Sequence, residues 1–174
     1  FFIPISTPFE LMASATDMDD DDLTYCWEQR NINPTIQYDD ENGIYGPQPG
    51  SPVGNSPIFR SFLPTDDPSR VFPRMELIVN NIMSNAEVLP TYNRSMIFRC
   101  TARDNHPTSG GIDWEQVSFR ATENAGPFVV TSPNTVSEVW TVGDYTEVTW
   151  DVANTDGEEV NCQRVDIRLS TDGG

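Results

Sequence analysis

Aspartate residues crowd into one short segment near the start of the sequence. Asp17, Asp19 and Asp21 alternate along this segment, and Asp20 and Asp22 raise the number of carboxylates to five within six residues. Two carboxylates about 4 Å apart repel by about 4 kcal/mol at an effective dielectric constant of about 20, so a fixed loop of this composition is costly without a cation. Calcium prefers oxygen ligands of this kind. The segment therefore predicts a calcium site, and the alternative is a solvated acidic loop that binds no metal.

The spacing matches part of an EF-hand loop and excludes a complete one. Counted from Asp17, Glu28 occupies position twelve, where an EF-hand has its bidentate glutamate. Position six is Asp22, whereas the sharp turn of an EF-hand needs glycine there. Residues 23–29 alternate between apolar and polar types, which indicates a strand after the loop and not a helix. We therefore expect calcium in a D-x-D-x-D loop that leads into a strand.

Catalytic patterns in the chain are weak. His106 lies near Ser109 in a loop rich in proline and glycine, without the nucleophile turn of a Ser-His-Asp hydrolase. Carboxylates clustered within six residues do not offer the pair that a glycosidase places across a cleft. One histidine cannot supply the three imidazoles of the zinc motif HExxHxxGxxH. We therefore expect no enzymatic activity from this chain itself.

Four tryptophans offer aromatic surfaces. Trp27 and Trp150 occupy strand positions that are expected to face a core. Trp114 and Trp140 stand near strand starts, where exposed rings could stack on sugars. Trp114 and Trp140 are therefore the candidate ligand-binding residues.

Composition disfavours two classes of partner. The 174 residues include 27 acidic side chains and ten arginines but no lysine, and the formal net charge is −17. Such a field repels phosphate backbones and anionic lipid surfaces, so nucleic acid and membrane-surface partners are not expected, and it concentrates divalent cations. No apolar run approaches the ~20 residues of a membrane-spanning helix, and no signal peptide is recognisable. Because the chain starts at Phe1 without methionine, we expect it to be part of a longer polypeptide.

Period-two alternation predicts strands on both sides of the acidic segment. Residues 1–7 should form an extended edge segment, because Pro4 and Pro8 exclude helix. The turn-rich loop 104–111 predicts a hairpin beside the strand that follows the acidic loop. The expected strands of this first unit are 9–15, 23–29, 94–103 and 114–122.

A long connection separates the early strands from the hairpin. Residues 30–93 are rich in Pro, Gly, Asn and Asp, and the run 46–57 cannot hold regular structure. Within the connection we expect a short strand at 58–62. Helical spacing of apolar residues behind Pro73 predicts one short helix near 73–83.

A second unit begins after the break at Gly126. It contains strand candidates separated by Asn, Asp and Gly turns, a spacing typical of a sandwich. The unit is too short to close a sandwich by itself, so we expect it to be truncated or docked on the first unit. The candidate strands are 128–131, 139–140, 146–152 and 160–169.

Three cysteines show no CxxC spacing, which argues against a structural zinc site. One disulfide with one thiol left over is an open alternative, with Cys26 and Cys100 as the pair. Strand parity argues against it, because Cys26 should face outward and Cys100 inward. Arg99 and Arg103 share the outward face near the acidic end, where we expect them to pair with carboxylates.

Two motifs of the first unit resemble those of cadherin-like repeats. ATDMD at 15–19, followed by LTY at 23–25, resembles their A-x-D-x-D loop, and ARD at 102–104 with Pro107 resembles their late A-x-D-x-x-P element. The resemblance implies a Greek-key β-sandwich in which the loops carrying these motifs lie at the same end and share calcium. The candidate metal ligands are Asp17, Asp19, Asp21 and Asp104, followed by Asp22, Glu28 and, on the preceding strand, Glu10.

Further segments spread over nearly the whole chain, namely LTYCWEQ at 23–29, FRSF at 59–62, RCTARDN at 99–105, GPF at 126–128, and VTWDVANT at 148–155 with LSTDGG at 169–174. Together they resemble the region behind the catalytic domain of secreted, reprolysin-like (M12B-type) zinc metallopeptidases of Bacteroidetes-type bacteria. The resemblance implies a secreted or cell-surface bacterial parent with its protease domain upstream in the same polypeptide. It also implies a cadherin-like domain at 1–124 and the first strands of an Ig-like domain at 126–174.

The expected function is therefore a non-catalytic, calcium-stabilised accessory domain that acts as a rigid spacer or a recognition module of a secreted zinc metallopeptidase. The alternative is an adhesion module that binds an extracellular protein or glycan, with an incidental acidic loop. A third interpretation is a chaperone-like segment that assists the protease itself.

Overall fold

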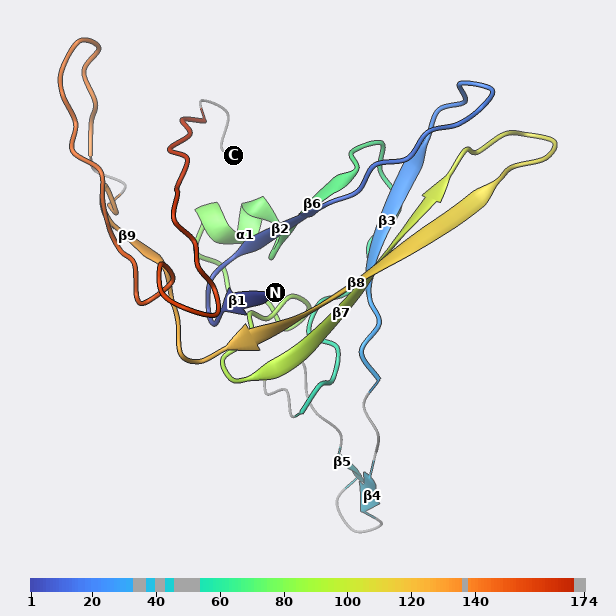
Figure 1. Ribbon diagram of the computed structural model, residues 1–174, viewed down its shortest axis with the longest axis horizontal. Coiled ribbons are helices and arrows are strands. Elements are labelled where there is room, and N and C mark those ends of the chain that lie inside the picture. The colour runs from blue at the N-terminus through green and yellow to red at the C-terminus, as the bar shows by residue number, and fades with distance from the viewer. Residues whose placement is uncertain (33–36, 40–42, 46–53, 136–137, 171–174) are drawn as a thin grey trace.

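The structure, a computed structural model, describes residues 1–32, 37–39, 43–45, 54–135 and 138–170 (Figure 1). Strands dominate it, which confirms the predicted all-β class. No helix of these described ranges is long and apolar enough to cross a membrane. The elements in chain order are β1 (Phe2–Pro4), β2 (Phe9–Met12), β3 (Thr24–Gln29), β4 (Gln37–Asp39), β5 (Gly43–Tyr45), β6 (Ser69–Phe72), α1 (Met75–Val79), β7 (Arg94–Arg103), β8 (Ile112–Thr122), β9 (Val129–Ser132) and β10 (Thr149–Asp151).

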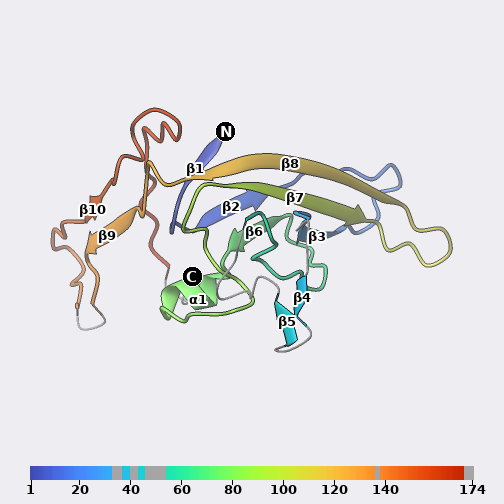
Figure 2. The same ribbon diagram turned by 90° about the horizontal axis from the view of Figure 1, so that it is seen from below.

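Two sheets form the first unit. The larger has the order β1-β8-β7-β3, with β7 antiparallel to both its neighbours and β1 parallel to β8. β2 and β6 form an antiparallel ribbon on one side of this sheet (Figure 2). The edge segment predicted from Pro4 and Pro8 and the hairpin predicted beside the strand after the acidic loop are thereby confirmed. The two layers make a β-sandwich.

Phenylalanine rings fill the space between the sheet and the ribbon. Phe9 of β2 contacts the rings of Phe72, Phe98 and Phe119 at centroid distances of 5.0, 5.9 and 5.7 Å. Every second residue of β7 from Met96 onward faces this layer, because successive strand side chains point to opposite faces. Burial of these apolar rings is what holds the layers together.

The first unit departs from the predicted elements in its connections. The strand expected at 9–15 ends at Met12, because the next partner along β6, Pro68, has no N–H to continue the ladder. Residues 58–62 form no strand, only an isolated bridge between Phe59 and Glu87. β6 was not predicted. The helix expected near 73–83 is confirmed as the shorter α1, whose end is followed by Asn81 at φ 50°.

The long connection predicted at 30–93 is described only in part. Residues 33–36, 40–42 and 46–53 lie outside the described residues, and most of the run 46–57 with them. The described remainder holds β4, β5, β6 and α1.

The second unit contains fewer strands than expected. β9 and β10 pair antiparallel, whereas 139–140 and 160–169 form no strand. Val165, Ile167 and Leu169 alternate as a strand would, yet they are 46%, 66% and 75% exposed. The prediction failed there because alternation creates a strand only where a neighbouring strand supplies hydrogen bonds.

The second unit is docked on the first. Phe128 N donates to Thr7 Oγ1 at 2.9 Å, and Thr122 Oγ1 donates to Glu159 Oε2 at 2.6 Å. At the junction Gly126 has φ +98°, and a Cβ there would lie 2.3 Å from the Ile5 carbonyl oxygen. Only glycine permits this close approach.

Candidate functional site

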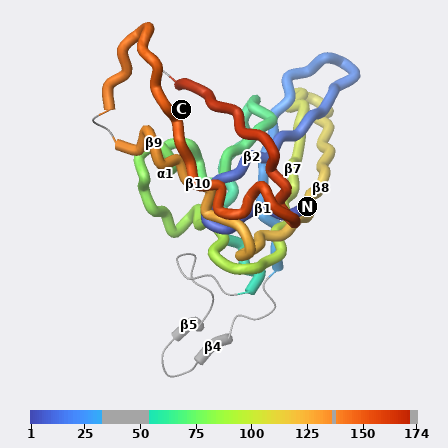
Figure 3. The backbone as a smooth tube through the Cα atoms, turned by 60° about the vertical axis from the view of Figure 1, so that its left-hand side comes forward, coloured from blue at the N-terminus to red at the C-terminus, as the bar shows by residue number. Residues whose placement is uncertain are grey.

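Two loops meet at one end of the sandwich. The acidic loop, residues 13–23, joins β2 to β3, and the hairpin loop, residues 104–111, joins β7 to β8. The side-chain amide of Asn105 links them by donating to Thr24 Oγ1 at 3.0 Å and to the Asp22 carbonyl oxygen at 3.4 Å. Both loops lie at the end of the molecule away from β9 and β10 (Figures 1 and 3).

Asp17 organises the acidic loop. Its Oδ1 atom accepts hydrogen bonds from the backbone N–H groups of Asp19 at 2.9 Å and Asp21 at 3.2 Å. A short acidic side chain that binds N–H groups just ahead of it favours a turn over a strand or helix. This bonding explains why the chain turns at residues 17–21 although five carboxylates repel one another there.

Asp104 organises the hairpin loop in the same way. Its Oδ1 accepts from His106 N at 3.1 Å and its Oδ2 from Gly111 N at 2.6 Å. These bonds, first from Gly111 and then from His106, hold the pKa of Asp104 below its ordinary value. A Cβ at Gly111 would lie 2.9 Å from Asp104 Oδ2, so the absence of a side chain there makes room for the carboxylate.

A pocket of about 440 Å³ lies between the two loops. Asp17 from the acidic loop, Asp104 from the hairpin loop and Asp113 from β8 all line it, together with apolar Leu23. Asp113 was missed by sequence analysis. The signal that would have revealed it is register, since Asp113 pairs with Ala102 across the hairpin, two residues before Asp104.

The other predicted ligands are not all at this pocket. Asp19 and Asp22 are exposed and Asp21 is half-buried, all three in the acidic loop. Glu10 lies on β2 opposite Val71, and Glu28 lies on β3, where its Oε1 accepts from Ser61 Oγ at 3.4 Å. Glu10 and Glu28 do not line the pocket. Glu28 is position twelve counted from Asp17, and in an EF-hand a helix brings this residue back to the loop. Here Glu28 belongs to an extended strand that rises about 3.3 Å per residue, so it lies away from the loop.

The donor set fits calcium in its chemistry, since carboxylate and backbone oxygens are hard ligands. Asp17 Oδ1 already accepts two backbone hydrogen bonds, whereas each Asp104 oxygen accepts one and retains acceptor capacity. Within the described residues, however, no three acidic, histidine or cysteine side chains are grouped closely enough to hold a metal ion as they stand. A cation that takes six to eight oxygens would therefore have to draw the two loops together.

Arg99 lies in an arrangement different from the one predicted. Its guanidinium carbon lies 3.8 Å from the ring centroid of Trp114, and the described ion pairs involve only Arg70 and Arg74, not Arg99 or Arg103. The reason is register, because Trp114 pairs with Thr101 and its ring reaches diagonally to Arg99. Trp114 is 51% exposed. Trp140, 44% exposed, lines a separate surface pocket with Pro133.

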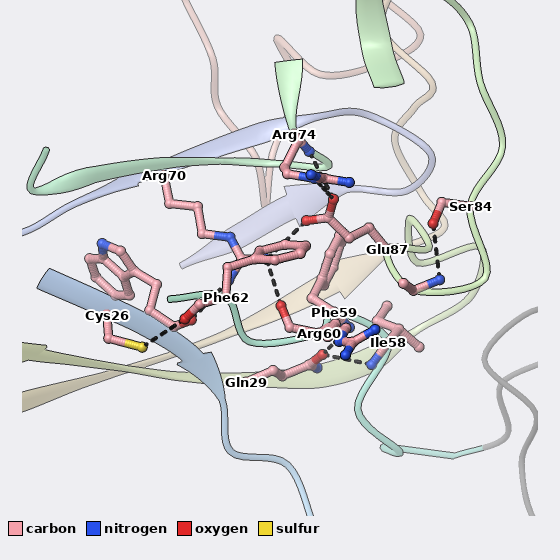
Figure 4. Close-up of polar contacts among 12 residues, drawn as sticks. Cys26, Gln29, Ile58, Phe59, Arg60, Phe62, Arg70, Arg74, Ser84 and Glu87 are labelled. Carbon is pink, nitrogen blue, oxygen red and sulfur yellow. Dashed lines mark hydrogen bonds and ion pairs between the residues drawn. The ribbon is translucent and has the colours of Figure 1, made fainter. Parts of the chain in front are cut away.

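A buried polar cluster connects β3, β6 and the segment around Glu87 (Figure 4). Both carboxylate oxygens of Glu87, whose side chain is fully buried, are bound: Oε1 by Arg70 at 2.9 Å and Oε2 by Arg74 at 3.0 Å. Gln29 Oε1 accepts from the N–H groups of Ile58 and Phe59. These contacts tie residues 58–62 to β3, so the cluster is structural.

The cysteines and His106 serve local structure. Cys26, Cys100 and Cys162 are free thiols, so the open alternative of a Cys26–Cys100 bridge is not realised. Cys26 pairs with Thr101, one residue beyond Cys100, and so lies on the opposite face of the sheet. Burial raises the pKa of the Cys100 thiol to about 11. His106 Nδ1 is contacted by backbone N–H groups of its own loop.

Comparison with protein-family models, curated proteins and solved structures finds no match for this chain. The functional assignment is therefore based on the geometry of the two loops and of the Arg99–Trp114 contact.

Proposed function

We propose that this chain is a non-catalytic, calcium-stabilised accessory domain of a secreted bacterial zinc metallopeptidase, with a cadherin-like Greek-key first unit. The observation that carries the proposal is that Asp17 and Asp104, from loops distant in sequence, line the same pocket as Asp113. The accessory domain acts as a rigid spacer or recognition module beside the protease domain of the same polypeptide. The metallopeptidase context rests on the sequence resemblance alone.

Calcium, when bound, would supply the positive charge that offsets the clustered carboxylates. Asp17, Asp104 and Asp113, which line the pocket, would hold it, and Asp19 and Asp21 of the acidic loop would complete the oxygen set once the loop closes on the ion. The backbone bonds to Asp17 and Asp104 hold each of these two carboxylates within its loop before any cation arrives. Because the two loops connect β2 to β3 and β7 to β8, a shared cation would join both layers of the sandwich at this end.

Thermal melts in calcium and in EDTA test the proposal. Binding to the folded state alone contributes about 2.7 kcal/mol when free calcium exceeds Kd a hundredfold. For a chain of this size that corresponds to a rise in Tm of roughly 5–10 °C. We expect Asp17→Asn and Asp104→Asn each to remove most of this rise.

Asp144→Asn is the matched control, because it removes the same charge from an exposed residue of the second unit. The control should retain the full calcium response. Equal Tm values of the unaltered chain in calcium and in EDTA would overturn the proposal.

The proposal that this chain belongs to a zinc metallopeptidase is tested on the full-length parent protein. We expect its sequence to contain HExxHxxGxxH upstream of this chain, and deletion of this chain to leave peptide hydrolysis by the protease domain intact. Loss of secretion or of all activity on deletion would instead support the chaperone-like interpretation.

A further inference from the structure

The outer face of the large sheet carries a second cluster of polar and aromatic side chains. Phe98 and Cys100 of β7 face the phenylalanine core, so Arg99, Thr101 and Arg103 face the other way. β2, β6 and α1 all lie on the core side of β7 and β8 (Figure 2). On this face Arg99 and Arg103 are half-buried and Thr101 between them is buried, whereas Trp114 is 51% exposed.

Arg99 is held in one geometry on this face. Its guanidinium stacks on the Trp114 ring with the 3.8 Å separation given above, well inside the range of a cation–π contact. Its Nε atom is buried and has no acceptor among the described residues, while its terminal nitrogens are not buried. The guanidinium is thus a planar donor fork whose hydrogen-bonding capacity is unused within the described part of the chain.

The charge of the outer face differs from that of the whole chain. Arg103 lies on the same face of β7, and Arg120 on the same face of β8. Along β3, β7 and β8 the carboxylate on this face is Glu28, which pairs in register with Arg99 but forms no ion pair with it within 4.0 Å. An excess of arginine is therefore concentrated here although the net charge is −17.

A planar carboxylate matches this fork, because two parallel N–H···O bonds form at once and charge strengthens both. The part of the Trp114 indole that Arg99 does not cover offers an apolar surface on which the C–H face of a sugar ring can pack. We propose that Arg99 and Trp114 bind the carboxylate and ring of a uronic acid unit in an acidic polysaccharide. This site does not depend on calcium in the acidic loop.

Titration calorimetry with a short oligogalacturonate tests the site, in EDTA to exclude bridging by a divalent cation. Arg99→Lys keeps the charge but loses the planar fork, and we expect it to weaken binding about tenfold. Trp114→Ala should weaken binding by at least as much. Arg120→Gln, which removes a charge from the same face away from the fork, should change Kd less than threefold.

Two ligand controls keep the test independent of protein folding. The methyl-esterified oligomer lacks the carboxylate charge and should not bind the unaltered chain. Short poly-glutamate has carboxylates without sugar rings and should compete poorly. Equal binding of the ester, equal competition by poly-glutamate, a loss in Arg120→Gln as large as in Arg99→Lys, or no binding of oligogalacturonate at millimolar concentration each overturns the proposal.

Discussion

Asp104 accepts N–H groups from Gly111 and His106, and these bonds favour its ionised form. Asp17 likewise accepts two backbone N–H groups, in the facing loop. Arg99 is held differently, by stacking on Trp114. At the scale of single residues, the acidic and the basic candidate binding groups therefore lie at different places. The carboxylates line the pocket between the two loops, and the guanidinium of Arg99 lies on the outer face of the large sheet.

The depressed pKa of Asp104 predicts a specific pH dependence. The pKa of Asp104 is lower in the folded chain than its ordinary value of 3.8. Ionised Asp104 therefore stabilises the folded state fully at pH values above the pKa of the unfolded chain, and this stabilisation is lost as the pH falls through the pKa of the folded chain. In EDTA we expect Asp104→Asn to lower Tm at about pH 6, and the difference from the unaltered chain to vanish in strong acid. Melts across the acid range measure it. A difference that stays constant at every pH would contradict the assignment.

At the scale of elements, the hairpin of β7 and β8 is the structural centre of the first unit. It pairs with β3 on one side and β1 on the other, and its loop brings Asp104 to the acidic loop. β9 follows β8 in the chain after Gly126, which packs closely against Ile5, and β9 pairs with β10. The position of the second unit therefore depends on how tightly the chain can pass Ile5.

Two glycines allow this contact to be measured. Gly126 and Gly143 both have φ +98°, but a Cβ at Gly143 meets nothing within 4 Å. Alanine at either position adopts the same positive φ, so the extra cost at position 126 reports crowding against Pro4 and Ile5 together with the restriction that Pro127 places on the residue before it. We expect Gly126→Ala to lower the free energy of unfolding by at least about 1 kcal/mol more than Gly143→Ala, measured in urea. Equal effects would show that the contact is relaxed.

At the scale of the whole molecule, Glu87 joins parts that are distant in sequence. Arg70 binds Glu87 and also donates from Nη1 to the Trp27 carbonyl oxygen on β3 at 2.8 Å. Because Arg70 belongs to β6, this one side chain connects the ribbon to the large sheet. Burial lowers the pKa of Arg70, and Glu87 opposes that shift.

Glu87→Gln should therefore destabilise the whole chain. It leaves the guanidinium of Arg70, 12% exposed, without its counter-charge, and breaking a buried pair costs about 3–5 kcal/mol. Urea unfolding measures the change, with the exposed Glu158→Gln as control. A loss below about 1 kcal/mol would show that water replaces the carboxylate.

Local pattern alone was enough to predict the strands of the hairpin, its partner after the acidic loop, and the short helix, because alternation and turn residues act within a few positions. The clustering of aspartates indicated the acidic loop, and the resemblance to cadherin-like repeats indicated Asp104. Local pattern failed at 160–169, where the apolar alternation is present but the segment pairs with no strand of the described residues.

Amino-acid order by itself thus determined the all-β class, the faces of the strands and the acidity of one loop. Only the tertiary structure decided that Asp113 lines the pocket, that Arg99 stacks on Trp114, and that Glu87 is buried between two arginines. The physical reason is that periodicity states which way a side chain points, whereas its partner is set by register and packing between segments far apart in the chain.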